Sequence, residues 1–141
     1  MHNVVVPIDG SAAALRALGY VLENLRGRAG ARIHLINVQE PKLHVWPGKL
    51  VSPDMIEAEM RKEGAQILYS AETAVRGADP VCTSHVSIGD AGEKIVAYAM
   101  DHGCDSIAMG TRGMGVVESL VMGSVAQKVA RLAPMPVTLV K

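Results

Sequence analysis

The chain of 141 residues contains no phenylalanine, and aromatic residues make up only 3% of it. Proteins that bind single-stranded nucleic acid stack the bases on aromatic side chains, so this scarcity argues against that class. The formal net charge is zero, with 14 basic and 14 acidic residues, which excludes the basic excess of a nucleic-acid or polybasic membrane surface. We therefore expect neither nucleic acid nor a membrane as a partner.

Cysteines and long apolar runs are also scarce. Two cysteines, Cys82 and Cys104, are too few for a disulfide framework or a metal-ligand cluster, which favours a reducing compartment. No apolar stretch approaches the roughly 20 residues of a membrane span. The apolar run near the N-terminus stops at Pro7 and Asp9, unlike a signal peptide. These features predict one domain, residues 1–141, in the cytoplasm.

The histidines do not have the spacing of a metal site. No two of them are related by an i, i+4 step, so we predict solvated or hydrogen-bonded structural roles and no metal site for them. None lies near the predicted strand ends that carry Ser11 and Ser124, so no catalytic triad is expected. The five are His2, His34, His44, His85 and His102.

Short β-branched apolar runs alternate with longer stretches of helical periodicity. Strands are predicted at 3–8, 31–38, 81–88, 105–110 and 137–140. Helices are predicted at about 11–28, 53–76, 91–102 and 124–132. Parallel strands need long crossover connections, so this alternation predicts an α/β fold with one open parallel sheet and helices on both faces. Ligands of such sheets bind beyond the C-terminal ends of the strands.

The segment GTRGMGVVESLVMGSV, residues 110–125, follows the fourth predicted strand and leads into the last helix. Its glycines allow the backbone to approach a ligand closely, and the first N–H groups of the helix, at Ser124 and Val125, attract anions. Arg112 can add a charge-assisted contact. The pattern predicts an anion cradle. The alternative is a plain loop in which Gly123 permits tight packing of helix on strand.

The glycine spacing does not match the common phosphate-binding motifs. A Walker A loop requires a lysine before its serine or threonine, whereas Met122 and Gly123 precede Ser124 here, and the dinucleotide pattern G-x-G-x-x-G is not met. The spacing present is G-x2-G-x9-G-S. Together with the opening VVVPIDGS and the ending APMPVTLVK, it resembles the universal stress protein family over essentially the whole chain.

This resemblance implies a Rossmann-like sheet of order 3-2-1-4-5 that binds ATP, optionally with Mg²⁺, between the first and fourth strands. It places Pro7 and Val38 around the adenine, and Asp9 near the ribose or a phosphate-bound metal. Asp9 has an alternative role as a helix cap beside Ser11. The phosphates would be lined by Gly110, Arg112, Gly113, Gly123, Ser124 and Val125.

The sequence departs from the family pattern at two positions. Many ATP-binding members have a serine or threonine two residues after the motif serine, where this chain has Ala126. Many also have a basic residue in the nine-residue spacer, whereas this spacer has Glu118 and no base. The contacts to the terminal phosphate, and the preference among ATP, ADP and AMP, stay open on the sequence.

Two segments suggest protein partners. The fifth predicted strand is an apolar edge with little charge to protect it, and members of the family often dimerise in antiparallel fashion through this strand. We therefore predict a homodimer through Val137, Thr138, Leu139 and Val140. The loop around Trp46 is a candidate lid over the nucleotide, a contact for an unidentified protein partner, or a hydrophobic plug over the second helix.

Three functions remain open. The favoured one is an ATP-binding regulatory protein of the stress response; the others are a nucleotide-free homodimeric interaction module and a slow ATPase. Asp9 and Arg112 are the groups best suited to hydrolysis, but binding alone accounts for both. We therefore predict at most weak hydrolysis and no catalytic residue.

Overall fold

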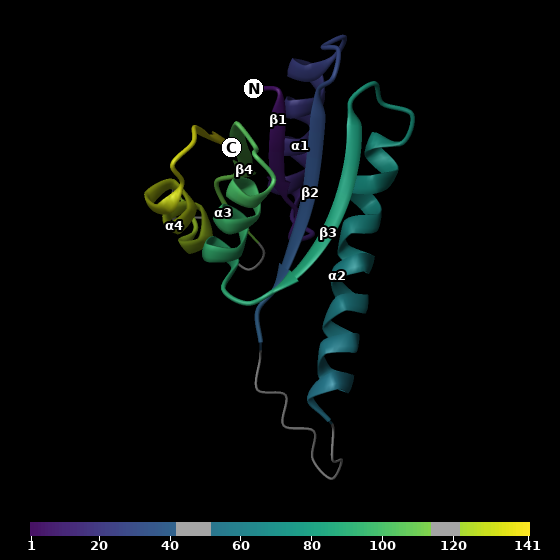
Figure 1. Cartoon of the computed structure of the whole chain (residues 1–141), viewed down its shortest axis with the longest axis vertical. Coiled ribbons are helices and arrows are strands. Elements are labelled where there is room, and N and C mark those ends of the chain that lie inside the picture. Colours follow the sequence, from purple (N-terminus) through teal and green to yellow (C-terminus); the bar gives the residue numbers. More distant parts are fainter. Residues whose placement is uncertain (42–51, 114–121) are drawn as a thin grey trace.

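The structure is a computed structural model of the whole chain, and it describes residues 1–41, 52–113 and 122–141 (Figure 1). The predicted Trp46 loop and the position of Glu118 lie outside these residues. The strands are β1 (Asn3–Pro7), β2 (Arg32–Gln39), β3 (Val81–Ile88), β4 (Ser106–Gly110) and β5 (Val137–Val140). The helices are α1 (Ala12–Leu25), α2 (Pro53–Val75), α3 (Ala91–Asp101) and α4 (Ser124–Leu132). Every predicted element is present, with ends shifted by a few residues at most.

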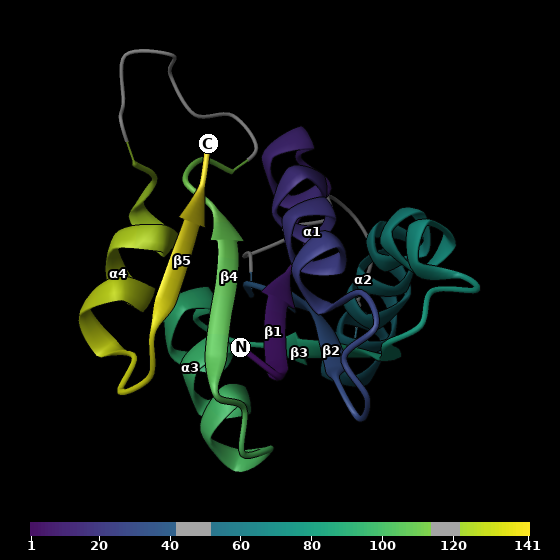
Figure 2. The same ribbon diagram turned by 90° about the horizontal axis from the view of Figure 1, so that it is seen from above.

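The strands form one parallel sheet of order β3-β2-β1-β4-β5, which confirms the predicted topology. Helices α1 and α2 cover one face of the sheet, and α3 and α4 cover the other (Figure 2). The chain leaves β1 toward β2 on one side and returns to β4 on the other. The connections after β1 and β4 therefore diverge and open a crevice beyond the C-terminal strand ends.

Two apolar layers hold the helices to the sheet. Alternation along β1 sends Val4 and Val6 into the layer under α1 and α2, and Val5 into the layer under α3 and α4. All three valines are completely buried. Full burial of an aliphatic side chain of this size contributes roughly 1.5–3 kcal/mol, so the central strand is firmly fixed below the crevice.

Not every large apolar side chain of the helices is buried. Leu15 and Leu132 retain 39% and 38% of their accessible surface. The buried side of α1 begins with the alanines Ala13, Ala14 and Ala17, because this part of the helix lies very close to β4. A Cβ atom added to Gly110 would come within 2.8 Å of the Ala13 side chain.

Strand β3 also has exposed side chains. The strand has its predicted limits, but it forms an edge of the sheet, and Val81, Thr83, Ser84 and His85 are exposed. An edge strand is covered less than the strands inside the sheet, so its burial depends on its place in the sheet.

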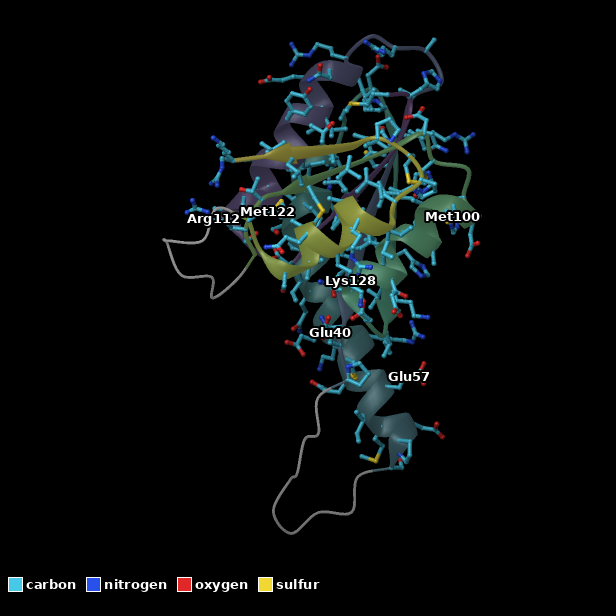
Figure 3. The ribbon with its side chains drawn as sticks, turned by 90° about the vertical axis from the view of Figure 1, so that its left-hand side faces the viewer. Glu40, Glu57, Met100, Arg112, Met122 and Lys128 are labelled. Carbon is cyan, nitrogen blue, oxygen red and sulfur yellow. The ribbon has the colours of Figure 1, made fainter. Side chains whose placement is uncertain are left out.

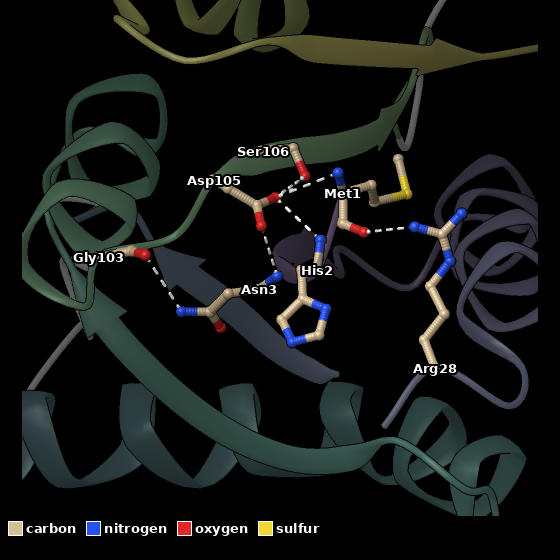
Figure 4. Close-up of polar contacts among 7 residues, drawn as sticks. All are labelled: Met1, His2, Asn3, Arg28, Gly103, Asp105 and Ser106. Carbon is tan, nitrogen blue, oxygen red and sulfur yellow. Dashed lines mark hydrogen bonds and ion pairs between the residues drawn. The ribbon is translucent and has the colours of Figure 1, made fainter. Parts of the chain in front are cut away.

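The N-terminus is tied to β4 at the end of the sheet opposite the crevice (Figure 4). The Asp105 carboxylate accepts hydrogen bonds from the backbone N–H of His2 at 3.1 Å and of Asn3 at 2.9 Å. Partial burial opposes the charge of Asp105, but the N–H of Asn3, the Ser106 hydroxyl and the N–H of His2 together lower its pKa. The start of β1 is thus anchored away from the crevice.

Three of the histidines gather on the α3 side of the sheet, which the sequence did not predict. His34 of β2 is only 8% exposed, and its Nδ1 lies 3.1 Å from the Tyr98 hydroxyl of α3. The rings of His85 and His102 lie 5.0 Å and 3.8 Å from the ring of Tyr98. The predicted structural, hydrogen-bonded role thus applies to His34, although the histidines are not scattered.

A hydrogen bond to β1 completes this cluster. The Nε2 atom of His34 lies 2.7 Å from Oδ1 of Asn3, whose amide nitrogen donates to the carbonyl oxygens of His102 and Gly103. Burial, followed by the charges of His102 and Arg32, lowers the pKa of His34. The neutral imidazole therefore joins β1, β2 and the end of α3.

Two further predictions concern cysteines and membranes. Cys82 and Cys104 are both free, in agreement with the separation of β3 and β4 in the sheet. Within the described ranges, no helix has the length and apolar character needed to cross a bilayer.

Candidate functional site

A cavity of about 660 Å³ opens at the C-terminal ends of β1, β2 and β4. Its size lies within the range of roughly 300–1,000 Å³ that is typical of small-molecule sites. All nine residues selected from the sequence line it, so they are neighbours in space; their contact with a nucleotide stays a prediction. The nine are Pro7, Asp9, Val38, Gly110, Arg112, Gly113, Gly123, Ser124 and Val125.

One part of the cavity wall is apolar and comes partly from a helix that sequence reasoning missed. Pro7 and Val38 lie at the ends of β1 and β2, and α2 adds Met60 and Ile67. Helical periodicity indicated the inner face of α2, but it could not show which strand ends that face overhangs. Glu63, also on α2, was missed for the same reason.

The turn after β1 directs Asp9 toward the glycine segment. Gly10 has φ of +89°, which allows the chain to reverse tightly before α1. The Oδ1 atom of Asp9 accepts the N–H of Ser11 at 2.9 Å, and the Ser11 hydroxyl accepts the N–H of Ala14 at 3.2 Å. Ser11 is therefore the N-cap of α1, and Asp9 lies beside it and accepts the N–H of this cap residue.

The lack of a side chain has a different structural reason at each of the three motif glycines. At Gly110, a side chain would collide with Ala13 of α1, and at Gly113 a Cβ atom would lie 2.7 Å from Oδ2 of Asp9. The nearest atoms to a Cβ at Gly123 are 3.6–3.8 Å away, which is ordinary contact. Packing therefore explains Gly110 but does not require glycine at 123, so the plain-loop alternative leaves Gly123 unexplained.

Gly123 matters because it is the N-cap of α4. The other helices have side-chain caps: Ser11 for α1, Ser52 for α2 and Asp90 for α3. Among the described residues, no side chain caps the α4 N-terminus, and its first turn has no acidic residue. No described side chain therefore covers the positive end of α4 in the cavity wall.

The backbone donors of this helix end have few internal partners. The N–H of Gly123 donates to the carbonyl oxygen of Thr111 at 2.7 Å, and the first bond within the helix runs from Gln127 to Gly123. In the part of the chain that the structure describes, the N–H groups of Ser124, Val125 and Ala126 find no acceptor. Three adjacent N–H groups at a helix start suit an anion such as a phosphate.

Arg112 is the cation on this side of the cavity. It lies with Met122 where the two described ends of the glycine segment approach each other (Figure 3). The Cα atom of Arg112 and the backbone nitrogen of Gly113 each lie 3.8 Å from the position that a Cβ atom on Gly123 would take. The two described ends of the glycine segment are therefore neighbours in space. A guanidinium there can donate charge-assisted hydrogen bonds to an anion held at this helix end.

Metal binding by protein side chains alone has no basis in the described ranges, where no group of three or more histidine, cysteine, aspartate or glutamate side chains could hold an ion. Asp9 is a single carboxylate beside the cradle. It therefore suits a cation whose other ligands are phosphate oxygens and water, as Mg²⁺ prefers.

Known proteins are similar to this chain over its whole length. The family model described as the universal stress protein family matches residues 1–141. A universal stress protein of Thermus aquaticus, encoded in the 3′ region of a QAH/OAS sulfhydrylase gene, is 34% identical over 99% of this chain and 98% of its own.

Solved structures show the same fold. A universal stress protein in complex with cAMP has a TM-score of 0.71 and 23% identity, covering 99% of this chain and 97% of its own. The Archaeoglobus fulgidus universal stress protein in complex with dAMP has a TM-score of 0.69 and 24% identity, covering 100% and 98%. With a family model that spans its whole length, the chain belongs to the universal stress protein family.

Proposed function

We propose that this chain is a regulatory ATP-binding protein of the cytoplasmic stress response, which holds its nucleotide between β1 and β4. The observation that carries the proposal is the uncapped start of α4 inside a cavity large enough for a nucleotide. Bound cAMP and dAMP in two similar structures support an adenine nucleotide as the ligand class.

Two parts of the cavity wall would contact the two ends of such a ligand. Pro7 and Val38 belong to the apolar wall and would contact adenine. The phosphates would lie on the N–H groups of Ser124 and Val125, within reach of Arg112. Glycines 110, 113 and 123 keep side chains away from this path.

Asp9 would lie between these ends, next to the ribose or to a Mg²⁺ ion carried by the phosphates. Its carboxylate is beside Gly113, on the phosphate side of the cavity. Mg²⁺ would supply positive charge to the terminal phosphates. Asp9 and Arg112 both serve binding, so the proposed function includes no catalytic residue.

A calorimetric titration of the purified, nucleotide-stripped protein with ATP and Mg²⁺ tests the function. We expect saturable binding of about one nucleotide per chain, because each chain has one such helix end in its cavity. An absence of heat, with no competition from any adenine nucleotide, would favour the nucleotide-free interaction module instead. That alternative has some support from Ala126, which lacks the hydroxyl common in ATP-binding members.

We also propose that the protein is a homodimer through β5, and that its nucleotide state is read by a further protein. The N–H groups of Ile107 and Thr111 bond to the carbonyl oxygens of Pro136 and Val140, so the backbone groups of Val137 and Leu139 face away from β4. This apolar edge is open to pairing with another strand. Light scattering at micromolar concentration should give a dimer, and a monomer would contradict this part of the proposal.

A further inference from the structure

The charged side chains around the cavity are mostly acidic. Asp9, Glu40 and Glu63 line it, and Arg112 is the one cation among its described lining residues. A nucleotide in this cavity thus meets more carboxylates than cations.

Neighbouring cations already have partners. Lys128 of α4 is paired with Asp90 at 3.0 Å, and Arg61 of α2 is paired with Glu57 at 2.9 Å. The guanidinium of Arg16 donates to the carbonyl oxygen of the last residue at 2.9 Å. Lys128 lies on α4, apart from Arg112 (Figure 3). A longer phosphate chain would have to draw these cations out of existing contacts.

The positive charge of the cradle matches a single phosphate group. The open end of α4 is equivalent to roughly half a positive charge, and Arg112 adds one full charge. A phosphate monoester carries a charge of about −1.5 to −2 near pH 7, so one such group is nearly balanced. Further phosphates add negative charge in a cavity that also holds the Asp9 carboxylate against Gly113.

We propose that the cavity ranks adenine nucleotides by their phosphate charge: AMP binds more tightly than metal-free ATP, and ATP binds well only as its Mg²⁺ complex. This inference rests on the proposed function. The carboxylates at Asp9, Glu40 and Glu63 set the ranking, with Arg112 as the anchor for one phosphate. The chain would then respond to the balance of nucleotides, and to the metal state of ATP, through electrostatics alone.

The test is calorimetry with AMP, ADP and ATP at low ionic strength, first in EDTA and then in excess Mg²⁺. In EDTA, AMP should bind at least about tenfold more tightly than ATP, because each like-charge contact at close range is worth a factor of this order. Mg²⁺ should strengthen ATP binding by a similar factor and leave AMP binding nearly unchanged. ADP should lie between them.

A charge-removing variant tests the role of the carboxylates. Glu63→Gln keeps the shape of the side chain, and it should narrow the ratio of AMP to ATP affinity in EDTA by severalfold. Glu72→Gln is the matched control, since it makes the same change of net charge on α2 at a residue that does not line the cavity. The control should leave the ratio as it is in the unaltered chain.

The outcomes separate this inference from the proposed function. If ATP in EDTA binds as tightly as AMP or more tightly, the ranking is wrong while nucleotide binding stands. An equal change of the ratio in Glu63→Gln and Glu72→Gln would overturn the role given to Glu63. If no adenine nucleotide binds under either condition, the proposed function itself fails, and the ranking fails with it.

Discussion

The N-termini of α3 and α4 line the same cavity, but their backbone N–H groups have different partners. At α3, the Asp90 carboxylate accepts the N–H of Glu93 at 3.0 Å, and the Glu40 carboxylate accepts the N–H of Ala91 at 3.1 Å. At α4, Gly123 offers no side chain to the helix start. Acidic side chains occupy the start of α3, whereas no described side chain occupies the start of α4.

The difference separates a helix end that serves the fold from one that can serve a ligand. Both ends carry the same dipole, so position beside a cavity does not by itself make an anion site. Elsewhere the chain also pairs backbone donors with its own carboxylates. The N–H of Asn3 donates to Asp105, and the N–H of Glu93 donates to Asp90. An uncapped start at α4 therefore suits an external anion, as proposed above.

Replacing Gly123 by aspartate should have the largest effect, because it gives α4 the same cap as α3. The added carboxylate would occupy the place of the phosphate, so we expect nucleotide affinity to fall at least about 100-fold. The helix itself should gain about 0.5 kcal/mol from its new cap. Calorimetry and thermal unfolding would measure these opposite changes.

Gly123→Asn is the control, because it adds a cap of nearly the same shape without charge. It should weaken binding much less than Gly123→Asp. Equal loss in both variants would mean that the side chain obstructs the site sterically, and that the charge argument at α4 is wrong.

Replacing Arg112 by glutamine should have the next largest effect. The change removes the full positive charge beside the open end of α4, and loss of one charge-assisted hydrogen bond should weaken nucleotide binding about tenfold. Arg112 is exposed, so the melting temperature should hardly change. Arg131→Gln, at the other end of α4, is the matched control and should bind nucleotide normally.

Removing the acidic cap of α3 should show the reverse pattern. Asp90→Ala takes away the acceptor for Glu93 and the partner of Lys128, so the protein should melt at a lower temperature. Nucleotide affinity should be nearly unchanged, because this helix end does not hold the phosphate. A large loss of affinity with an unchanged melting temperature would reverse the roles given to α3 and α4.

The pH dependence of this variant follows from the ionisation of Asp90. The N–H of Glu93, and then Lys128, lower the pKa of Asp90 in the folded protein. The stabilisation is therefore present above the unfolded pKa of about 3.9 and is lost as pH falls through the folded value. The difference in melting temperature between Asp90→Ala and the unaltered protein should shrink in strong acid.

The smallest expected effect concerns His34, whose neutral imidazole joins β1 and β2 to the C-terminal end of α3. Its pKa is lowered by burial and by the charges of His102 and Arg32, so its contribution to stability is present above about pH 6.5 and is lost as pH falls. Between pH 7 and 5, the melting temperature of the unaltered protein should fall more than that of His34→Gln. His2→Gln, at an exposed histidine, should follow the unaltered protein.

The sequence predicted the fold well because its signals were local. Ser11, Ser52 and the Pro53 that follows it mark helix starts, and β-branched runs mark the strands, so order and limits agree with the structure. Side-chain burial was harder to predict, since it depends on neighbours. The exposure of β3 follows from its place at the edge, which no feature of its own residues reveals.

The site was predictable where a motif is continuous in sequence and missed where the fold brings distant residues together. The glycine segment and the turn at Asp9 were found, whereas Met60 and Glu63 came from a helix with no motif. The histidine cluster was missed in the same way. Tyr98 and His102 are one helical turn apart, but their contact with His34 depends on the packing of α3 across β2.

The most direct test of the central claim is a ¹H–¹⁵N NMR titration of the nucleotide-free protein with AMP. If the phosphate lies on the open end of α4, the amides of Ser124, Val125 and Ala126 should shift most, while those of Ala91 and Glu93 at the filled end of α3 should stay nearly unchanged. Unshifted α4 amides at saturating AMP, or larger shifts at the start of α3, would contradict the account.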